Sequence, residues 1–150
     1  MNLSTKEFEN KITSAKNIEE LRTVLESLPK ESFENRFVDL CIKYNLTNSQ
    51  VQTASGINKS LFYAFFEKKN PKRARKPQKH HIIRMGLAMG ASVEEINELL
   101  KLGKHKELYA KNKDDAIIIF GINNKLDIEE IEGLLIDAGA TLSLHDKHDK

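Results

Sequence analysis

The strongest chemical signal in this sequence is a concentration of cationic side chains between residues 59 and 84. This window holds nine Lys and Arg residues against one acidic residue, Glu67, so its formal charge is +8. The whole chain of 150 residues carries only +2. The remaining residues are therefore acidic on balance, and a positive field is confined to one stretch. Such a field favours binding to a polyanion such as nucleic acid.

Hydrogen-bond donors stand at the start of this window. Asn58 is a suitable N-cap for a helix over about residues 59–67. Phe62 and Phe65 lie on the apolar side of that helix, which is expected to pack into the core. Its first turns offer three donors to base edges or phosphates: Lys59, Ser60 and Tyr63.

A loop follows this helix, over residues 68–81, where Pro71 and Pro77 disfavour regular structure. A solvated loop without a ligand is one interpretation. Contact with nucleic acid is the interpretation we favour, because the charge lies beside the donors described above. The candidate phosphate-binding side chains of this stretch are Lys68, Lys69, Lys72, Arg73, Arg75, Lys76 and Lys79.

A second short helix precedes the donors. Thr47 and Gln50 have the spacing of a capping box, which predicts a helix through about Ser55. Gly56 can adopt the backbone conformation of a tight turn. Ala54 has a small side chain that suits a close helix crossing. The two helices and their turn together have the pattern of a helix-turn-helix motif.

The other elements that must position this motif are also helical by their apolar spacing. Apolar residues recur every three or four positions through residues 4–28, which we interpret as two short helices ended by Pro29. The same spacing and a capping residue at each start predict further helices over residues 33–44, 78–90, 92–103, 114–124 and 127–139. The fold class we predict is all-α.

Ala116–Phe120 is the one ambiguous segment, since three consecutive Ile favour a strand. An internal repeat argues for a helix. A shift of 35 residues aligns Ile82–Leu100 with Ile117–Leu135 and gives eight identities in 19 positions. Residues 77–103 and 112–139 are therefore interpreted as two copies of one helical hairpin.

Other functional classes find little support. The chain has no apolar run of the roughly 18 residues that would cross a membrane, and its N-terminus does not resemble a signal peptide. A single cysteine, Cys41, fits a reducing cytoplasm. We find no arrangement of nucleophile and base, no cofactor motif and no metal motif, so we expect neither an enzyme nor a cofactor. His80 and His81 are adjacent, and we expect them to point apart on a helix rather than share a metal ion.

Residues 33–103 resemble the lambda-repressor-like, or XRE-type, helix-turn-helix domain of bacteria and their phages. The resemblance includes the Leu46-Thr47 pair, the Ser-Gly-Ile turn at residues 55–57, Pro77, and the "ASVEEINELL" segment that would form the fifth helix. Two features depart from the family. The loop before Pro77 is longer and more basic than usual, and Phe66 occupies a position that is more often polar.

The resemblance implies a five-helix DNA-binding core flanked by an N-terminal and a C-terminal helical hairpin. Asn48 and Gln50 would then approach phosphates, while Lys59, Ser60 and Tyr63 would face base edges. It implies a regulator of transcription that binds double-stranded DNA as a homodimer on a palindrome. The expected divisions are residues 1–31, 32–103 and 104–144, the last a dimer, effector or protein-partner surface, and a disordered tail at 145–150.

The alternative is a helix-turn-helix scaffold that binds another protein, such as a phage inhibitor or an antitoxin-like partner. The unusual loop and Phe66 motivate it. Phe66 is expected to pack, under the N-terminal hairpin or elsewhere in the core. The sequence specifies neither an operator, nor regulated genes, nor activation against repression, nor an effector.

Overall fold

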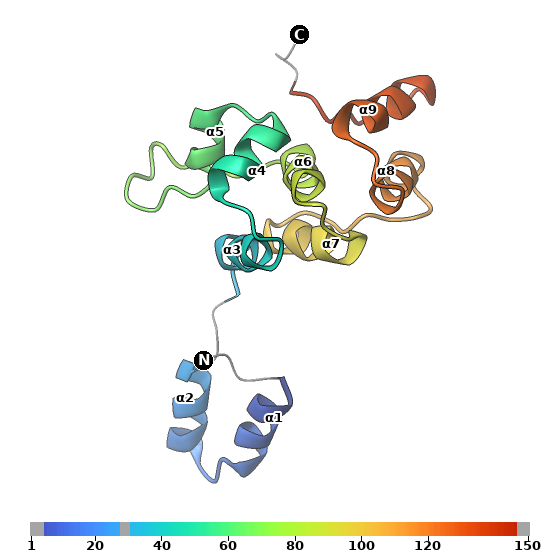
Figure 1. Cartoon of the computed structure of the whole chain (residues 1–150). Helices are drawn as coiled ribbons and strands as arrows, with labels where there is room; N and C mark the ends of the chain where they lie inside the picture. The colour runs from blue at the N-terminus through green and yellow to red at the C-terminus, as the bar shows by residue number, and fades with distance from the viewer. Residues whose placement is uncertain (1–4, 28–30, 147–150) are drawn as a thin grey trace. The chain divides into compact units, whose positions relative to one another are not determined.

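The computed structural model describes residues 5–27 and 31–146, and within them the regular structure is entirely helical (Figure 1). The chain divides between Glu31 and Ser32 into two compact units, each of which is described by itself. The helices are α1 (Thr5–Ser14), α2 (Ile18–Ser27), α3 (Phe33–Lys43), α4 (Asn48–Ser55), α5 (Lys59–Ala64), α6 (Lys79–Met89), α7 (Val93–Leu102), α8 (Lys113–Asn123) and α9 (Ile128–Asp137). The predicted all-α class is confirmed, and Ala116–Phe120 is helical. No helix in the described ranges is long and apolar enough to span a bilayer.

The first unit is the helical hairpin of α1 and α2. Asn17 caps α2, because its Oδ1 accepts the backbone N–H of Glu20 at 2.8 Å. The Glu20 carboxylate in turn accepts the N–H of Lys16 at 2.6 Å. Several apolar side chains of this hairpin remain exposed, among them Ile18.

Capping boxes start α4, α7 and α9 of the second unit, as the sequence predicts, and a fourth, of Gln78 and His81, starts α6. In α4, Thr47 Oγ1 accepts the N–H of Gln50 at 3.1 Å, and Gln50 Oε1 accepts the N–H of Thr47 at 2.8 Å. The starts of α7 and α9 repeat this exchange. Each box satisfies two backbone donors that no residue within the helix can reach.

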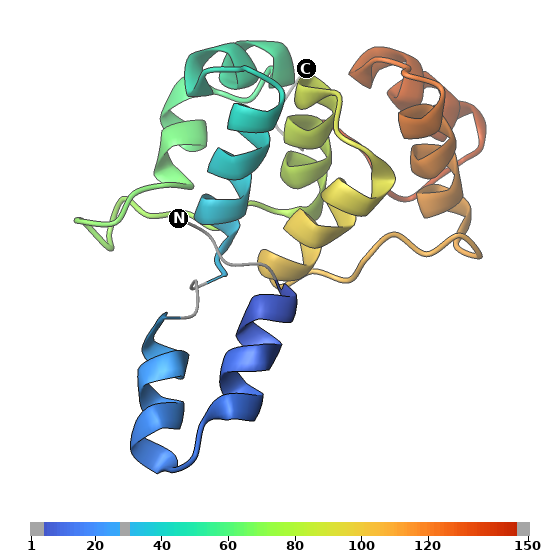
Figure 2. The ribbon, with the colours of Figure 1, turned by 60° about the horizontal axis from the view of Figure 1, so that its bottom comes forward.

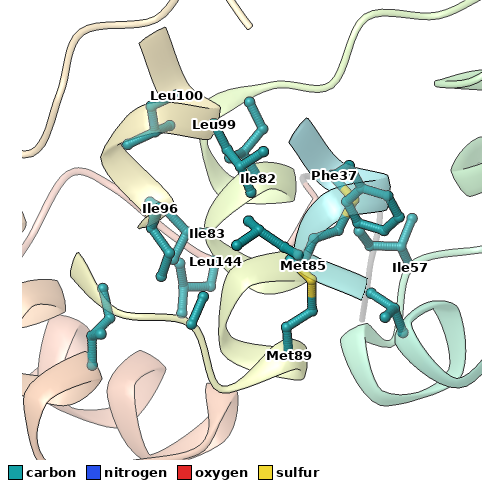
Figure 3. Close-up of a cluster of buried hydrophobic side chains, with 14 of the residues drawn as sticks. Phe37, Ile57, Ile82, Ile83, Met85, Met89, Ile96, Leu99, Leu100 and Leu144 are labelled. Atoms are coloured by element: carbon teal, nitrogen blue, oxygen red, sulfur yellow. The ribbon is translucent and has the colours of Figure 1, made fainter. Parts of the chain in front are cut away.

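The core of the second unit surrounds α6, which contributes Ile82, Ile83 and Met85 (Figure 3). Phe37 of α3 and Ile96 of α7 are also fully buried there. The full set of buried apolar side chains extends over every helix from α3 to α9. A central helix with side chains buried around most of its surface thus organises the unit.

The expected role of Ala54 in a close helix crossing is wrong. Ala54 is exposed, whereas its neighbour Ser55 is fully buried. The Ser55 carbonyl accepts a hydrogen bond from Nε of Arg84, a buried side chain of α6, at 2.8 Å. The end of α4 is therefore held by a cation from α6.

The internal repeat is present in three dimensions. A Cβ atom added at Gly86 would lie 2.4 Å from Cγ1 of Ile96, and one added at Gly121 would lie 2.4 Å from Cγ1 of Ile131. The backbone of α6 therefore meets α7 at the same close approach as α8 meets α9. Both positions need a residue without a side chain.

The turns between these helices also match, and a third one joins α3 to α4. Leu46 N donates to Cys41 O at 2.9 Å, Ala91 N to Gly86 O at 3.0 Å, and Leu126 N to Gly121 O at 2.9 Å. The residue before each of these donors has a positive φ, namely Asn45, Gly90 and Lys125. The same geometry also follows α7 and α9, where His105 N donates to Leu100 O at 2.8 Å and Ala140 N to Leu135 O at 2.9 Å after Lys104 and Gly139, both with positive φ. The described residues therefore contain this turn five times.

A C-terminal strap, residues 140–146, runs from the end of α9 back to α6. Its Leu144 is fully buried, the Leu144 carbonyl accepts from Arg84 Nη1 at 3.1 Å, and the Leu144 N–H donates to the buried carboxylate of Glu132 at 2.9 Å. The expected tail of residues 145–150 is therefore ordered at least through Asp146; residues 147–150 lie outside the described ranges. The strap is part of the core.

The strap ends beside His80 and His81, whose side chains we expect from the sequence to point apart. His80 Nε2 and His81 Nε2 lie 2.5 and 2.8 Å from the same oxygen, Oδ1 of Asp146, so the expectation that these rings diverge is wrong. They occupy the first turn of α6, where no preceding turn constrains them. Burial, together with the neighbouring His80, lowers the pKa of His81, which favours its neutral form.

Candidate nucleic-acid interface

Helix α5 presents its donors as the sequence predicts. Asn58 caps it, since its Oδ1 accepts the N–H groups of Ser60 at 2.9 Å and Leu61 at 3.3 Å. Phe62 is fully buried, and Tyr63 is 40% exposed. Lys59 and Ser60 are exposed as well. The three donor side chains therefore lie on the open side of α5.

This helix is shorter than predicted: it ends at Ala64, whereas the sequence predicts an end at about residue 67. The two following phenylalanines explain the early end. Phe65 is buried and its ring lies 5.1 Å from that of His81. Phe66 turns the other way, toward Phe37 of α3, with ring centroids 4.9 Å apart. The side chains of Phe65 and Phe66 thus pack on two different sides immediately after the last residue of α5.

Phe66 has a place in the core that accounts for its type. Besides Phe37, its ring contacts Phe33 and Phe62, with centroid distances of 6.0 and 5.3 Å. The four rings, of Phe33, Phe37, Phe62 and Phe66, form one cluster. The expectation that Phe66 packs is confirmed, and a special partner surface is not needed to explain it.

The basic loop, residues 68–76, is folded against the end of α5. The Glu67 carboxylate accepts the N–H groups of Lys69 and Asn70 at 2.9 and 3.2 Å. The Asn70 side chain accepts the N–H of Lys72 at 3.0 Å. The N–H of Arg75 then donates to the Ala64 carbonyl at 3.0 Å. These bonds give the loop a defined path instead of an extended arm.

A groove lies between α5 and this loop, with a volume of about 660 Å³. Ser60 and Tyr63 line it from the helix, and Lys72, Arg73 and Arg75 line it from the loop. Its complete lining is Asn58, Ser60, Leu61, Tyr63, Ala64, Glu67, Lys72, Arg73 and Arg75. Two of the three predicted base-contacting side chains and three of the predicted phosphate-contacting side chains thus lie on one concave surface.

Of the nine cations of the basic window, only Lys72, Arg73 and Arg75 line this groove. Two of the other six are held elsewhere in the unit. Lys79 Nζ lies 2.6 Å from Oδ1 of Asp115, a buried carboxylate of α8, so the structure assigns Lys79 to an ion pair. Arg84 is buried in the core. Seven cationic side chains of the window remain exposed: Lys59, Lys68, Lys69, Lys72, Arg73, Arg75 and Lys76.

Asn48 and Gln50 are exposed on the first turn of α4. The Oε1 atom of Gln50 is occupied by the capping box. Helix α4 packs beside α5 in the second unit, and both helices lie on one side of α6 (Figures 1 and 2). Helices α8 and α9 lie on the opposite side of α6 in both views.

The scaffold behind the interface contains a buried carboxylate that sequence reasoning missed. Glu95 of α7 accepts hydrogen bonds from Lys43 Nζ at 2.6 Å, from the hydroxyl of Tyr44, and from Ser92 N at 2.9 Å. Burial opposes its ionisation, but the bonds from Lys43, Ser92 and Tyr44 outweigh burial and lower the pKa of Glu95 to about 2. This anion ties the end of α3 to α7.

Comparisons of this chain with models of known families, with curated proteins and with solved structures find no match. Within the described ranges, the one group of three potential metal ligands is His80, His81 and Asp146.

Proposed function

We propose that this protein is a sequence-specific DNA-binding regulator of the lambda-repressor-like helix-turn-helix kind. One observation carries the proposal: Ser60 and Tyr63 of α5 and three cations of the basic loop, Lys72, Arg73 and Arg75, line the same groove. Phosphate contacts from such a loop supply affinity and orientation, and side chains at the start of a helix supply base specificity. We propose no catalytic role for these residues.

The dimensions of α5 are compatible with this role. Six helical residues span about 9 Å, and a recognition helix contacts base edges mainly with its N-terminal residues. Lys59, Ser60 and Tyr63 are those residues here. In this proposal the basic loop follows one DNA strand beside the major groove, while Asn48 and the Gln50 amide approach the other strand from α4.

The test is a DNA-binding titration at two salt concentrations, preceded by selection of a binding site from random or genomic fragments. Lys69, Lys72 and Arg73 are replaced together by Gln; Arg75 is kept, because its guanidinium bonds the carbonyls of Lys72 and Ala74. We expect weaker binding to all sequences, and a salt slope lower by about 0.9 for each lost phosphate contact.

A matched control removes the same charge elsewhere. Lys101, Lys106 and Lys111 are exposed on α7 and the linker before α8. Replacing these three by Gln should leave both affinity and salt slope nearly unchanged. Equal effects of the two triple variants would mean that only net charge matters, and no effect of the loop variant would mean that the loop does not touch DNA.

A homodimer belongs to the same proposal, since one helix-turn-helix covers few base pairs and dimers place two half-sites about 34–36 Å apart. An apolar hollow on α8 and α9, lined by Ile117, Phe120 and Leu134 among others, is the surface we propose for it. Phe120 is 56% exposed there. We expect light scattering at tens of micromolar to give a dimer, and Phe120→Asp to give a monomer. Ile42→Asp, at an exposed position of α3, is the control.

The second candidate function, a scaffold for another protein, is favoured by the same hollow. If the wild-type chain is monomeric and Ser60→Ala and Tyr63→Ala change neither affinity nor the selected sequence, the partner is a protein and not DNA. This conclusion requires that the wild type, Ser60→Ala and Tyr63→Ala are all folded, which far-UV circular dichroism checks.

A further inference from the structure

We propose that His80, His81 and Asp146 form a binding site for a divalent transition-metal ion such as Zn²⁺. This inference is independent of the proposed function. Its basis is a convergence of three ligand atoms: both Nε2 atoms point at Oδ1 of Asp146 from distances of 2.5 and 2.8 Å. Two imidazoles and one carboxylate are a ligand set that zinc accepts, with a fourth position left to water.

The distances are close to those that an ion requires. Zinc binds imidazole nitrogen and carboxylate oxygen at about 2.0–2.2 Å, so donors around a tetrahedral ion lie about 3.3 Å apart. Each Nε2–Oδ1 separation must therefore widen by less than about 1 Å. The imidazole rings are already side by side, with centroids 4.1 Å apart.

The surroundings hold these ligands in place. The side chain of His81 is 4% exposed, that of His80 is 12% exposed, and that of Asp146 is 31% exposed. Phe65 packs against His81, and the buried Leu144 anchors the strap two residues before Asp146. The nearby ammonium of Lys79 is paired with Asp115, which reduces its repulsion of a cation. The Arg84 guanidinium is directed at the carbonyls of Ser55 and Leu144.

A bound ion would replace the two hydrogen bonds between the Nε2 atoms and Asp146 Oδ1, and a third bond must change as well. Gln78 N donates to His81 Nδ1 at 3.1 Å, which leaves the proton of the metal-free ring on Nε2. An ion takes the Nε2 lone pair, the proton moves to Nδ1, and the Gln78 N–H turns to solvent at its exposed position. Metal binding therefore competes with part of the N-cap of α6.

The experiment titrates the tag-free full chain, first treated with chelator and then dialysed, with Co²⁺ and with Zn²⁺. Cobalt reports its own coordination through visible absorption, and calorimetry gives stoichiometry for zinc. We expect saturation at one ion per chain with the strong absorption of four-coordinate cobalt, and a higher melting temperature in the presence of zinc.

Variants locate the ion. His80→Gln and Asp146→Asn should each weaken binding on the order of 100-fold or more, because even groups outside the coordination sphere contribute 10- to 100-fold. His80 is replaced instead of His81 because the His81 ring accepts a hydrogen bond from Gln78 N at the start of α6, whose loss could disturb the fold. Melting curves and circular dichroism verify that each variant is folded before it is titrated.

A double variant, His145→Gln with His148→Gln, is the matched control for adventitious binding by the His-rich end of the sequence. It should bind cobalt as the wild type does. The proposal is overturned by a wild-type chain that does not saturate, by His80→Gln and Asp146→Asn chains that bind normally, or by loss of binding in the double variant. In the first case the three residues form a hydrogen-bonded contact only.

Discussion

Replacing Glu95 by Gln tests how the scaffold behind the interface is held together. The substitution keeps the size of the side chain but removes the anion that accepts hydrogen bonds from Lys43, Tyr44 and Ser92. The side chain of Glu95 is only 7% exposed. Its partners on α3 would then face a neutral amide, and part of the donor set would lose its acceptor.

The expected magnitude follows from the pKa. The folded-state pKa of Glu95 is about 2, against an ordinary value of 4.5. At about 1.4 kcal/mol for each pH unit, this interval corresponds to about 3 kcal/mol of stability. Water screens the Lys43 end of the pair, whose side chain is 59% exposed. We therefore expect a loss of about 2 kcal/mol at pH 7.

The pH dependence has a definite sign. A carboxylate whose pKa is depressed by folding contributes fully above its unfolded value of about 4.5, and its contribution disappears as the pH falls toward 2. The two proteins share every other ionisable group, so the effects of those groups cancel in a comparison. The informative quantity is therefore the difference in unfolding free energy between the two proteins.

Urea denaturation at a series of pH values between 7 and 2 measures this difference. We expect it to be largest above pH 5 and to shrink toward zero near pH 2. Glu94→Gln, one residue away at an exposed position, is the control and should behave as the wild type. A difference that stays constant across the whole range would refute the assignment of this stability to the Glu95 charge.

Two further predictions concern the interface and the repeat. Tyr63→Ala should relax specificity at one or two base pairs, at about 1–3 kcal/mol for a lost contact, with little change in melting temperature. Phe62→Ala, at a fully buried site, should cost about 3–5 kcal/mol of stability instead; binding-site selection and thermal melts separate the two. Gly86→Ala should destabilise the chain by about 1–3 kcal/mol, because its Cβ would lie 2.4 Å from Ile96. Gly133→Ala, where a Cβ meets nothing within 4 Å, should be neutral or stabilising by up to about 1 kcal/mol, and chemical denaturation of both variants checks the pair.

The C-terminal segments matter more to stability than the sequence indicates. A chain ended at Gly103 would be expected from sequence to remain a soluble half-site binder. In the structure such a chain would lack Leu144, which is fully buried in the hydrophobic core (Figure 3). It would also leave Arg84 without the Leu144 carbonyl. Surface substitutions such as Phe120→Asp are therefore better tests of assembly than truncation.

The sequence by itself determined the local structure of this protein. Capping residues such as Thr47 and Ser92 fix helix starts, because the hydrogen bonds they make are within four residues. Apolar spacing determined which side of α5 is buried: Phe62 is fully buried, whereas Tyr63, about 100° further around the helix, is exposed. The 35-residue repeat indicates that Ala116–Phe120 is helical, because this segment belongs to a second copy of a helical hairpin. In both copies a glycine of the first helix packs closely against an isoleucine of the second.

Tertiary structure alone decided which charged groups are available. Lys79 and Asp115 are 36 residues apart in sequence, and their pairing removes one predicted phosphate contact. Arg84 lies in the same basic window as the groove cations, yet its carbonyl partners turn it into the core. His80, His81 and Asp146 meet only because the strap returns to α6. Composition and spacing record the number of charges, whereas their partners depend on contacts between segments that only the packed core brings together.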